Sequence, residues 1–71
     1  MAIKVLTEIT GVVRAIEKKM GDTVNAGDVL VILESMKMEL PVEAPAAGTI
    51  AEIRCKEGQG VAEGDVLIVL T

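Results

Sequence analysis

The chain has 71 residues, of which 51% are hydrophobic and none is Phe, Trp or Tyr, and its formal net charge is −4. This length has room for a single domain over residues 1–71, and a core of Val, Ile, Leu, Ala and Met favours strands. An acidic chain without aromatic residues has neither a basic stripe for a phosphate backbone nor rings for base stacking, so we expect no nucleic-acid partner.

The sequence shows no targeting signal and no metal-binding pattern. No apolar run approaches the roughly 20 residues of a membrane span, and no basic segment precedes an apolar one at the N-terminus, so we expect a cytoplasmic chain without a membrane span. Cys55 is the single cysteine, and histidine is absent. A lone thiol makes no internal disulfide, zinc site or Cys–His nucleophile, and we expect Cys55 to fill a strand position.

In chain order, the first half reads as short strands separated by turns. An alternating segment around Ile3 and Val5 comes first, and Gly11 then opens a second apolar stretch. The stretch "KMGDTVNAGD", residues 19–28, is typical of turns, and the apolar strand "VLVIL", residues 29–33, follows it. Helix-period stripes are absent, so the pattern predicts an all-β fold.

The second half repeats the first without a gap. A shift of 37 positions places Gly11 on Gly48 and Met1 on Met38, and it aligns "GDVLVIL" with "GDVLIVL". Two copies are too few for a solenoid, so we expect them to face each other across a pseudo-two-fold axis as a sandwich or flattened barrel. Lys37 then lies on the crossover between the copies, and the chain ends lie at the opposite end of the molecule.

The repeated glycines and aspartates are interpreted as turn residues. Gly11, Gly21 and Gly27, with their copies, are expected in turns, where glycine has the conformational freedom that a turn requires. Asp28 and its copy Asp65 each follow a glycine. We expect them to hydrogen-bond the backbone and to have no functional role.

The crossover carries an unusual motif, "ESMKMEL", residues 34–40. Lys37 lies between Met36 and Met38, and Glu34 and Glu39 flank this triplet. A tight hairpin normally contains Asn-Gly, Asp-Gly or Gly-Gly, and none of these is present. Positive φ angles in this turn would cost of order 1–3 kcal/mol per residue and would indicate that function fixes the residues.

The methionines on either side of Lys37 indicate that this lysine has a function. Flexible thioether side chains at a solvent-facing tip are typical of recognition surfaces, whereas the structural alternative is that Met36 and Met38 pack over the barrel end as a lid. Lys37 has no neighbouring base, so we predict no catalytic residue in this chain. An amine at a protruding tip is instead well placed to be acylated by another enzyme.

The stretch "ESMKMEL" resembles the biotin-attachment motif of biotin carboxyl carrier proteins, usually Glu-Ala-Met-Lys-Met. The resemblance extends over "GDTVNAGDVLVILESMKME" and "APAAGTIAEI" to "KEGQGVAEGDVLIVL". This biotin/lipoyl-attachment family implies an all-β, flattened barrel of two four-stranded antiparallel sheets. It also implies that a biotin protein ligase attaches biotin covalently to Lys37, and that Met36 and Met38 recognise and position the site.

The resemblance also implies the function of a non-catalytic carrier subunit. In the family, the carboxybiotin arm carries CO2 from a biotin carboxylase to a carboxyltransferase. The parent complex would be a biotin-dependent carboxylase or decarboxylase, such as the acetyl-CoA or acyl-CoA carboxylase of fatty acid biosynthesis. The tether contributes effective concentration, because it makes delivery of the carboxyl group nearly intramolecular.

Three features depart from the usual family pattern. Ser35 replaces the alanine of the motif, and "LTEITG", residues 6–11, stands where many members have Pro-Met-Pro-Gly. Some acetyl-CoA carboxylase carriers have a protruding thumb insertion in one half. The gapless repeat leaves no room for one, so we expect a thumbless carrier.

Two other functions are compatible with the same fold. A lipoyl carrier has a similar two-copy barrel with a lysine at the same tip, usually within Asp-Lys-Ala, so Met-Lys-Met favours biotin. An unmodified β docking module would use the methionines as a patch for a partner protein.

Overall fold

The computed structural model describes residues 2–71, and Met1, the predicted counterpart of Met38, lies outside them. The chain forms eight strands: β1 (Ile3–Leu6), β2 (Gly11–Ile16), β3 (Thr23–Val24), β4 (Val29–Ser35), β5 (Met38–Glu43), β6 (Gly48–Ile53), β7 (Gly60–Val61) and β8 (Val66–Leu70). The short strands β3 and β7 lie in stretches that the sequence predicts as turns, because two residues show no strand periodicity.

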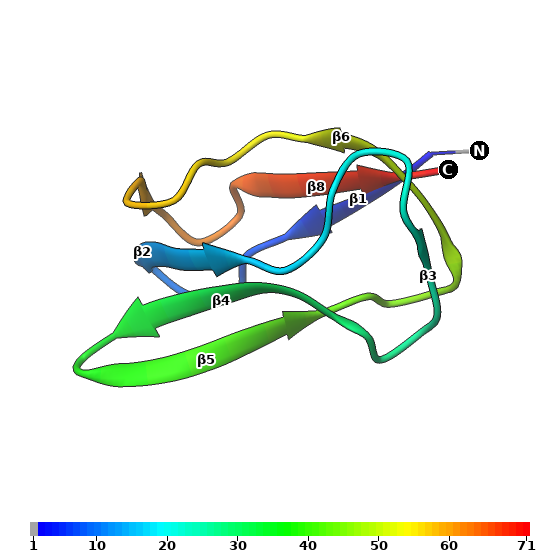
Figure 1. Cartoon of the computed structure of the whole chain (residues 1–71). Helices are drawn as coiled ribbons and strands as arrows, with labels where there is room; N and C mark the ends of the chain where they lie inside the picture. The colour runs from blue at the N-terminus through cyan, green and yellow to red at the C-terminus, as the bar shows by residue number, and fades with distance from the viewer. Residues whose placement is uncertain (1) are drawn as a thin grey trace.

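The strands form two four-stranded sheets with the orders β1-β8-β6-β3 and β5-β4-β2-β7, and all pairings are antiparallel. Figure 1 shows β1, β6 and β8 in one layer and β2, β4 and β5 in the other. The 37-residue shift carries β1 to β4 onto β5 to β8, so it exchanges the two sheets. The predicted flattened barrel with pseudo-two-fold symmetry is confirmed.

Equivalent backbone hydrogen bonds interlock the two halves. The N–H of Gly21 donates to the carbonyl oxygen of Ile50 at 2.8 Å, and the N–H of Gly58 donates to that of Val13 at 2.7 Å. Each bond joins a turn of one half to a strand of the other. Neither half therefore completes its backbone hydrogen bonding alone.

The turns confirm most of the predicted glycine and aspartate roles. Positive φ angles of 88–93° occur at four glycines: Gly21, Gly27, Gly58 and Gly64. The carboxylate of Asp28 accepts a hydrogen bond from the N–H of Asn25, and Asp65 accepts one from Ala62, both at 2.9 Å. The turn interpretation is wrong for Gly11 and Gly48, which begin strands β2 and β6 and have no positive φ.

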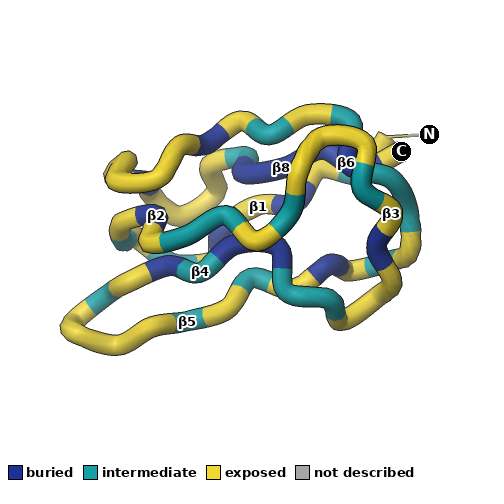
Figure 2. The backbone as a smooth tube through the Cα atoms, viewed as in Figure 1, coloured by how far each residue is buried: buried dark blue, intermediate teal, exposed yellow. Residues whose placement is uncertain are grey.

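The core lies between the sheets and consists mainly of aliphatic side chains. Val, Leu and Ile from both layers are fully or almost fully buried, and Figure 2 shows buried segments in both layers. Cys55 joins this core at 4% exposure. The predicted burial of Cys55 is confirmed, but its predicted strand position is wrong. It follows the end of β6, where the chain turns toward β7.

The thiol of Cys55 is expected to resist alkylation in the native protein. Burial raises the pKa of this thiol, so the reactive thiolate is scarce as well as inaccessible. Iodoacetamide should label it slowly at neutral pH and rapidly in denaturant, as followed by intact mass. The pKa of Cys55 is higher in the folded protein than in the unfolded one. The stability that the buried thiol contributes is therefore complete below the unfolded pKa and is lost as pH rises through the folded pKa. Rapid labelling of the native protein would contradict this placement.

The molecule is elongated, with extents of 33 × 17 × 17 Å. The turn between β4 and β5 lies at one end of the long axis, and the start of β1 lies with the end of β8 at the other (Figure 1). Ile3 pairs with Leu70 there. The predicted separation of the crossover from the two ends of the chain is therefore confirmed for residues 2–71.

Candidate functional site

Lys37 lies at the end of a long, regular hairpin. Strand β4 has seven residues and pairs with β5 as far as the pair Ser35–Met38. Only Met36 and Lys37 remain to make the turn, which is the shortest usual hairpin connection. The hairpin therefore holds Lys37 at the far end of the molecule with little freedom in its backbone.

The turn holds two non-glycine residues in a left-handed conformation. The φ angle is 53° at Met36 and 64° at Lys37, and these are the only non-glycine residues with positive φ in residues 2–71. Two-residue hairpin turns of type I′ need positive φ at both central positions, and Asn-Gly is their preferred sequence. Met-Lys makes the same turn at a cost of about 1 kcal/mol or more per residue. The residue choice at this turn opposes stability and indicates a functional constraint.

Both methionines of the motif face solvent. Met36 is 91% exposed and Met38 is 60% exposed, and Lys37 between them is also exposed. The alternative in which the methionines close the barrel end as a lid is wrong, because a lid would bury them against the core. The turn instead projects an amine flanked by two apolar, flexible side chains.

Gly11 supports the base of this hairpin. A Cβ atom added at Gly11 would lie 2.6 Å from the backbone oxygen of Glu34 and 3.4 Å from the Cβ of Ser35. Only glycine lets β2 approach Glu34 and Ser35, the last two residues of β4, this closely. Gly11 therefore acts through close backbone approach, and its copy Gly48 similarly approaches Thr71.

The charges beside the turn are arranged across three strands. Glu34 of β4 lies directly opposite Glu39 of β5, which is a like-charge pair that destabilises a sheet. Arg14 of β2 reaches across β4, and its Nε donates to Glu39 Oε2 at 3.2 Å. The pair is exposed and contributes little to stability, but it gives Glu39 a cation other than Lys37.

The turn presents an exposed amine that can accept an acyl group. Among the described residues, no group of three or more His, Cys, Asp or Glu side chains is placed to hold a metal ion. No helix in residues 2–71 is long and apolar enough to cross a membrane. The exposed amine of Lys37 fits covalent attachment of a carboxylic acid as an amide, because nothing covers it and two apolar side chains flank it.

Sequence reasoning singled out Lys37, Met36 and Met38, and the structure brings them together in one turn. It missed the positioning contacts of Gly11 and Arg14. Arg14 pairs with a residue 25 positions away, so no local pattern signals the contact. A signal for Gly11 was present, because Val12 follows it, whereas Asp or Gln follows each of the four turn glycines.

Comparison with known proteins places this geometry in a family. Residues 1–70 match the family described as "Biotin-requiring enzyme". The chain belongs to this family. It is 47% identical over 53 residues to the biotinylated protein TB7.3 homolog of Mycobacterium leprae, a match that covers 75% of each chain. It is 42% identical over 47 residues to the biotin/lipoyl attachment protein of Bacillus subtilis, covering 66% of this chain and 64% of that one.

Two solved structures contain a part that closely shares this fold. A single-chain, multi-domain long-chain acyl-CoA carboxylase matches with a TM-score of 0.93 and 33% identity over 99% of this chain. The urea carboxylase of Kluyveromyces lactis matches with a TM-score of 0.95 and 35% identity over 100% of this chain. The match spans 7% and 6% of those two proteins, respectively. This chain is thus similar to one small part of each carboxylase.

Relief of the left-handed strain at Met36 and Lys37 should stabilise the protein, although it removes the attachment site. Replacing Met36 with Asn and Lys37 with Gly creates the preferred type I′ sequence, so the free energy of unfolding should rise by about 1–2 kcal/mol. Thermal unfolding measures this change. As a control, Met20→Asn changes another methionine, 66% exposed and without positive φ, and should leave stability unchanged. A less stable double variant would show that the native turn is not strained.

Proposed function

We propose that this protein is a biotin carboxyl carrier and that Lys37 is the residue to which biotin is attached. The observation that carries the proposal is the position of Lys37 in a left-handed turn between two exposed methionines, at the end of the molecule opposite the start of β1 and the end of β8. Membership of the biotin-requiring family supports it. We assign to Met36 and Met38 the contacts by which the ligase recognises and positions the site.

Attachment is an acyl transfer that a biotin protein ligase would catalyse. After the ammonium group of Lys37 loses a proton to a base of the ligase, Nζ forms a C–N bond with the carbonyl carbon of biotin activated by the ligase with ATP. The C–O bond to the activating group breaks, and that group leaves with the electron pair. The amide product is neutral, so the protein becomes one charge more negative.

The carrier contributes position and effective concentration. Bound biotin supplies a ureido nitrogen that can carry a carboxyl group. The rigid hairpin holds the attachment point clear of the barrel, so that the arm can enter the sites of a biotin carboxylase and a carboxyltransferase in turn. Catalysis belongs to these partners in a carboxylase or decarboxylase, for example one acting on an acyl-CoA in the cytoplasm. The likeness to parts of two carboxylases supports this role.

Two observations favour biotin over a lipoyl group. The turn contains Met-Lys-Met rather than Asp-Lys-Ala, and both methionines are exposed where a modifying enzyme would contact them. The Mycobacterium leprae relative is named as a biotinylated protein. The name of the Bacillus subtilis relative includes both groups, so the experiment below compares biotin and lipoate directly.

The test is to offer the apo protein both modifications separately. One sample receives a biotin protein ligase, ATP and biotin, and the other receives a lipoate ligase, ATP and lipoate. Intact mass should show one added biotin in the first sample and no addition in the second, and avidin should capture only the first. Lipoylation without biotinylation would replace the proposal by a lipoyl carrier, and no addition in either sample would favour an unmodified docking module.

A further inference from the structure

A groove follows one side of the barrel, where the two sheets are not joined by strand pairing. It has a volume of about 720 Å³ and runs between β1 and β5, each of which is an edge strand of its sheet. These strands are related by the repeat and are not hydrogen-bonded to each other. The groove is therefore built into the symmetry of the fold, and it lies alongside the strand that follows Lys37.

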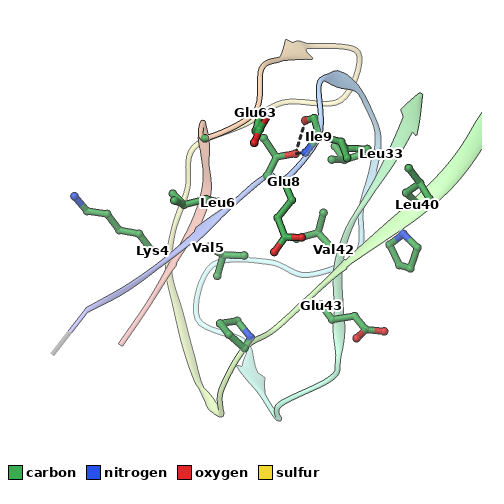
Figure 3. Close-up of a pocket in the computed structure, with 14 residues that line it drawn as sticks. Lys4, Val5, Leu6, Glu8, Ile9, Leu33, Leu40, Val42, Glu43 and Glu63 are labelled. Atoms are coloured by element: carbon green, nitrogen blue, oxygen red, sulfur yellow. Dashed lines mark hydrogen bonds between the residues drawn. The ribbon is translucent and has the colours of Figure 1, made fainter. Parts of the chain in front are cut away.

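The two walls of the groove provide an apolar lining. Leu33, Leu40 and Val42 contribute from one sheet, Val5 contributes from the other, and Ile9 contributes from the loop between β1 and β2. Figure 3 shows these five side chains around the same space. Leu40, Val42 and Ile9 are only partly buried, so the groove has apolar surface that a ligand can cover. Covering such surface is favourable at about 25 cal/mol per Å².

One polar group is aimed into this apolar space. The side chain of Glu8 extends from the loop after β1, and its carboxylate points into the groove in Figure 3. Within residues 2–71 this carboxylate has no hydrogen-bond or ion-pair partner. The hydroxyl of Thr7 donates to the carbonyl oxygen of Ile9 at 2.7 Å and braces the loop. Glu8 is exposed, so the groove offers a free carboxylate as an acceptor for N–H donors.

Lys37 is near enough to deliver a tethered group to this groove. Leu40 lies three residues along β5 from Lys37, which is about 10 Å at the usual rise of a strand. A lysine side chain extended by the five-carbon acyl chain of biotin has about ten bonds before the ring system and spans roughly 12 Å. A tether of this length gives a millimolar effective concentration, so even a weak site is occupied.

We propose that the groove between β1 and β5 is a resting site for the biotin ring carried by Lys37. The tetrahydrothiophene ring and acyl chain cover Leu40, Val42 and Ile9, and a ureido N–H donates to the carboxylate of Glu8. This inference rests on the proposed attachment to Lys37. It deepens that function, because it assigns the arm a place on the carrier when no partner enzyme holds it.

The charge of the groove limits what it can hold. Glu8, Glu43 and Glu63 line it together with Lys4, which leaves an excess of negative charge. A neutral ring with N–H donors suits this surface, whereas an anionic form of the ring is disfavoured. An added peptide strand is also disfavoured, because Pro41 lies on the free edge of β5 and lacks an N–H to donate.

The test compares apo and biotinylated protein by amide NMR. Biotinylation should shift amide signals along the groove, from Val5 to Ile9 and from Leu40 to Glu43, as well as at the turn. Shifts confined to residues 35–39 in protein whose mass shows one biotin would overturn the resting site and leave the carrier function intact. Absence of any added biotin would overturn both. Groove shifts that depend on protein concentration in the apo form would assign the groove to a second copy instead.

The capture rate by avidin provides the second readout. Replacing Glu8 with Ala removes the acceptor, and the biotin should become available to avidin at least about threefold faster, because the freely exposed fraction rises. Glu52→Ala is the matched control, since Glu52 is an exposed glutamate outside the groove, and it should leave the rate unchanged. Equal capture rates for wild type and Glu8→Ala would overturn the role of Glu8.

Discussion

Lys37→Arg is expected to abolish biotin attachment completely while leaving the free energy of unfolding within about 0.5 kcal/mol of the wild type. A guanidinium stays protonated and is not acylated, so no ligase can complete the transfer. Arginine at position 37 adopts the same left-handed conformation as Lys37, so the backbone strain stays the same. Because Lys37 is exposed, the packing of the core does not change either. Intact mass after incubation with ligase, ATP and biotin measures the first effect, and thermal unfolding measures the second.

Lys19→Arg is the matched control for this variant. Lys19 is another exposed lysine in a turn region, and it is followed by an exposed methionine, Met20. The control should accept one biotin at the wild-type rate. Biotin on Lys37→Arg would show that another lysine is the site, and a large loss of stability would show that Lys37 has a structural role.

Gly11→Ala is expected to destabilise the protein by about 1–3 kcal/mol, which lowers Tm by roughly 5–20 °C in a domain of this size. The added Cβ would lie 2.6 Å from the backbone oxygen of Glu34, and a backbone atom within a sheet cannot move away without breaking strand pairing. The strain falls on the last residues of β4 before the Lys37 turn. Thermal or denaturant unfolding measures the change.

Gly60→Ala separates this clash from the general effect of losing a glycine. Gly60 is also in a strand, beside β2, but nothing lies within 4 Å of an added Cβ and its φ is not positive. The free energy of unfolding of Gly60→Ala should equal that of the wild type or exceed it by about 0.4–1 kcal/mol, because alanine restricts the unfolded chain. Equal destabilisation of the two variants would contradict the close approach at Gly11.

The architecture was predictable because the repeat is a global signal. The same shift of 37 positions aligns Gly11 with Gly48, Gly27 with Gly64 and every strand of the first half with a segment of the second. The sequence therefore predicts two equivalent halves. Placing Lys37 at the crossover follows from this symmetry. The hairpin turn carried no local signal, since Met-Lys is not a turn sequence, and its location depended on the repeat.

Other features depend on distances that a linear pattern does not contain. The strands β3 and β7 have two residues each, too few for an alternation. Cys55 is buried because the chain bends after β6 rather than because of strand alternation. The approach of Gly11 to Glu34 and the groove between β1 and β5 arise only when the sheets pack.

A tryptic peptide map of the protein treated with biotin protein ligase, ATP and biotin identifies the modified residue directly. Trypsin cleaves after Lys19, Lys37 and Arg54, so unmodified protein yields peptides 20–37 and 38–54. An amide on Lys37 blocks cleavage there. We predict a single peptide, residues 20–54, that carries one biotin on Lys37 in its fragment spectrum. Biotin on a peptide that excludes Lys37 would contradict the account.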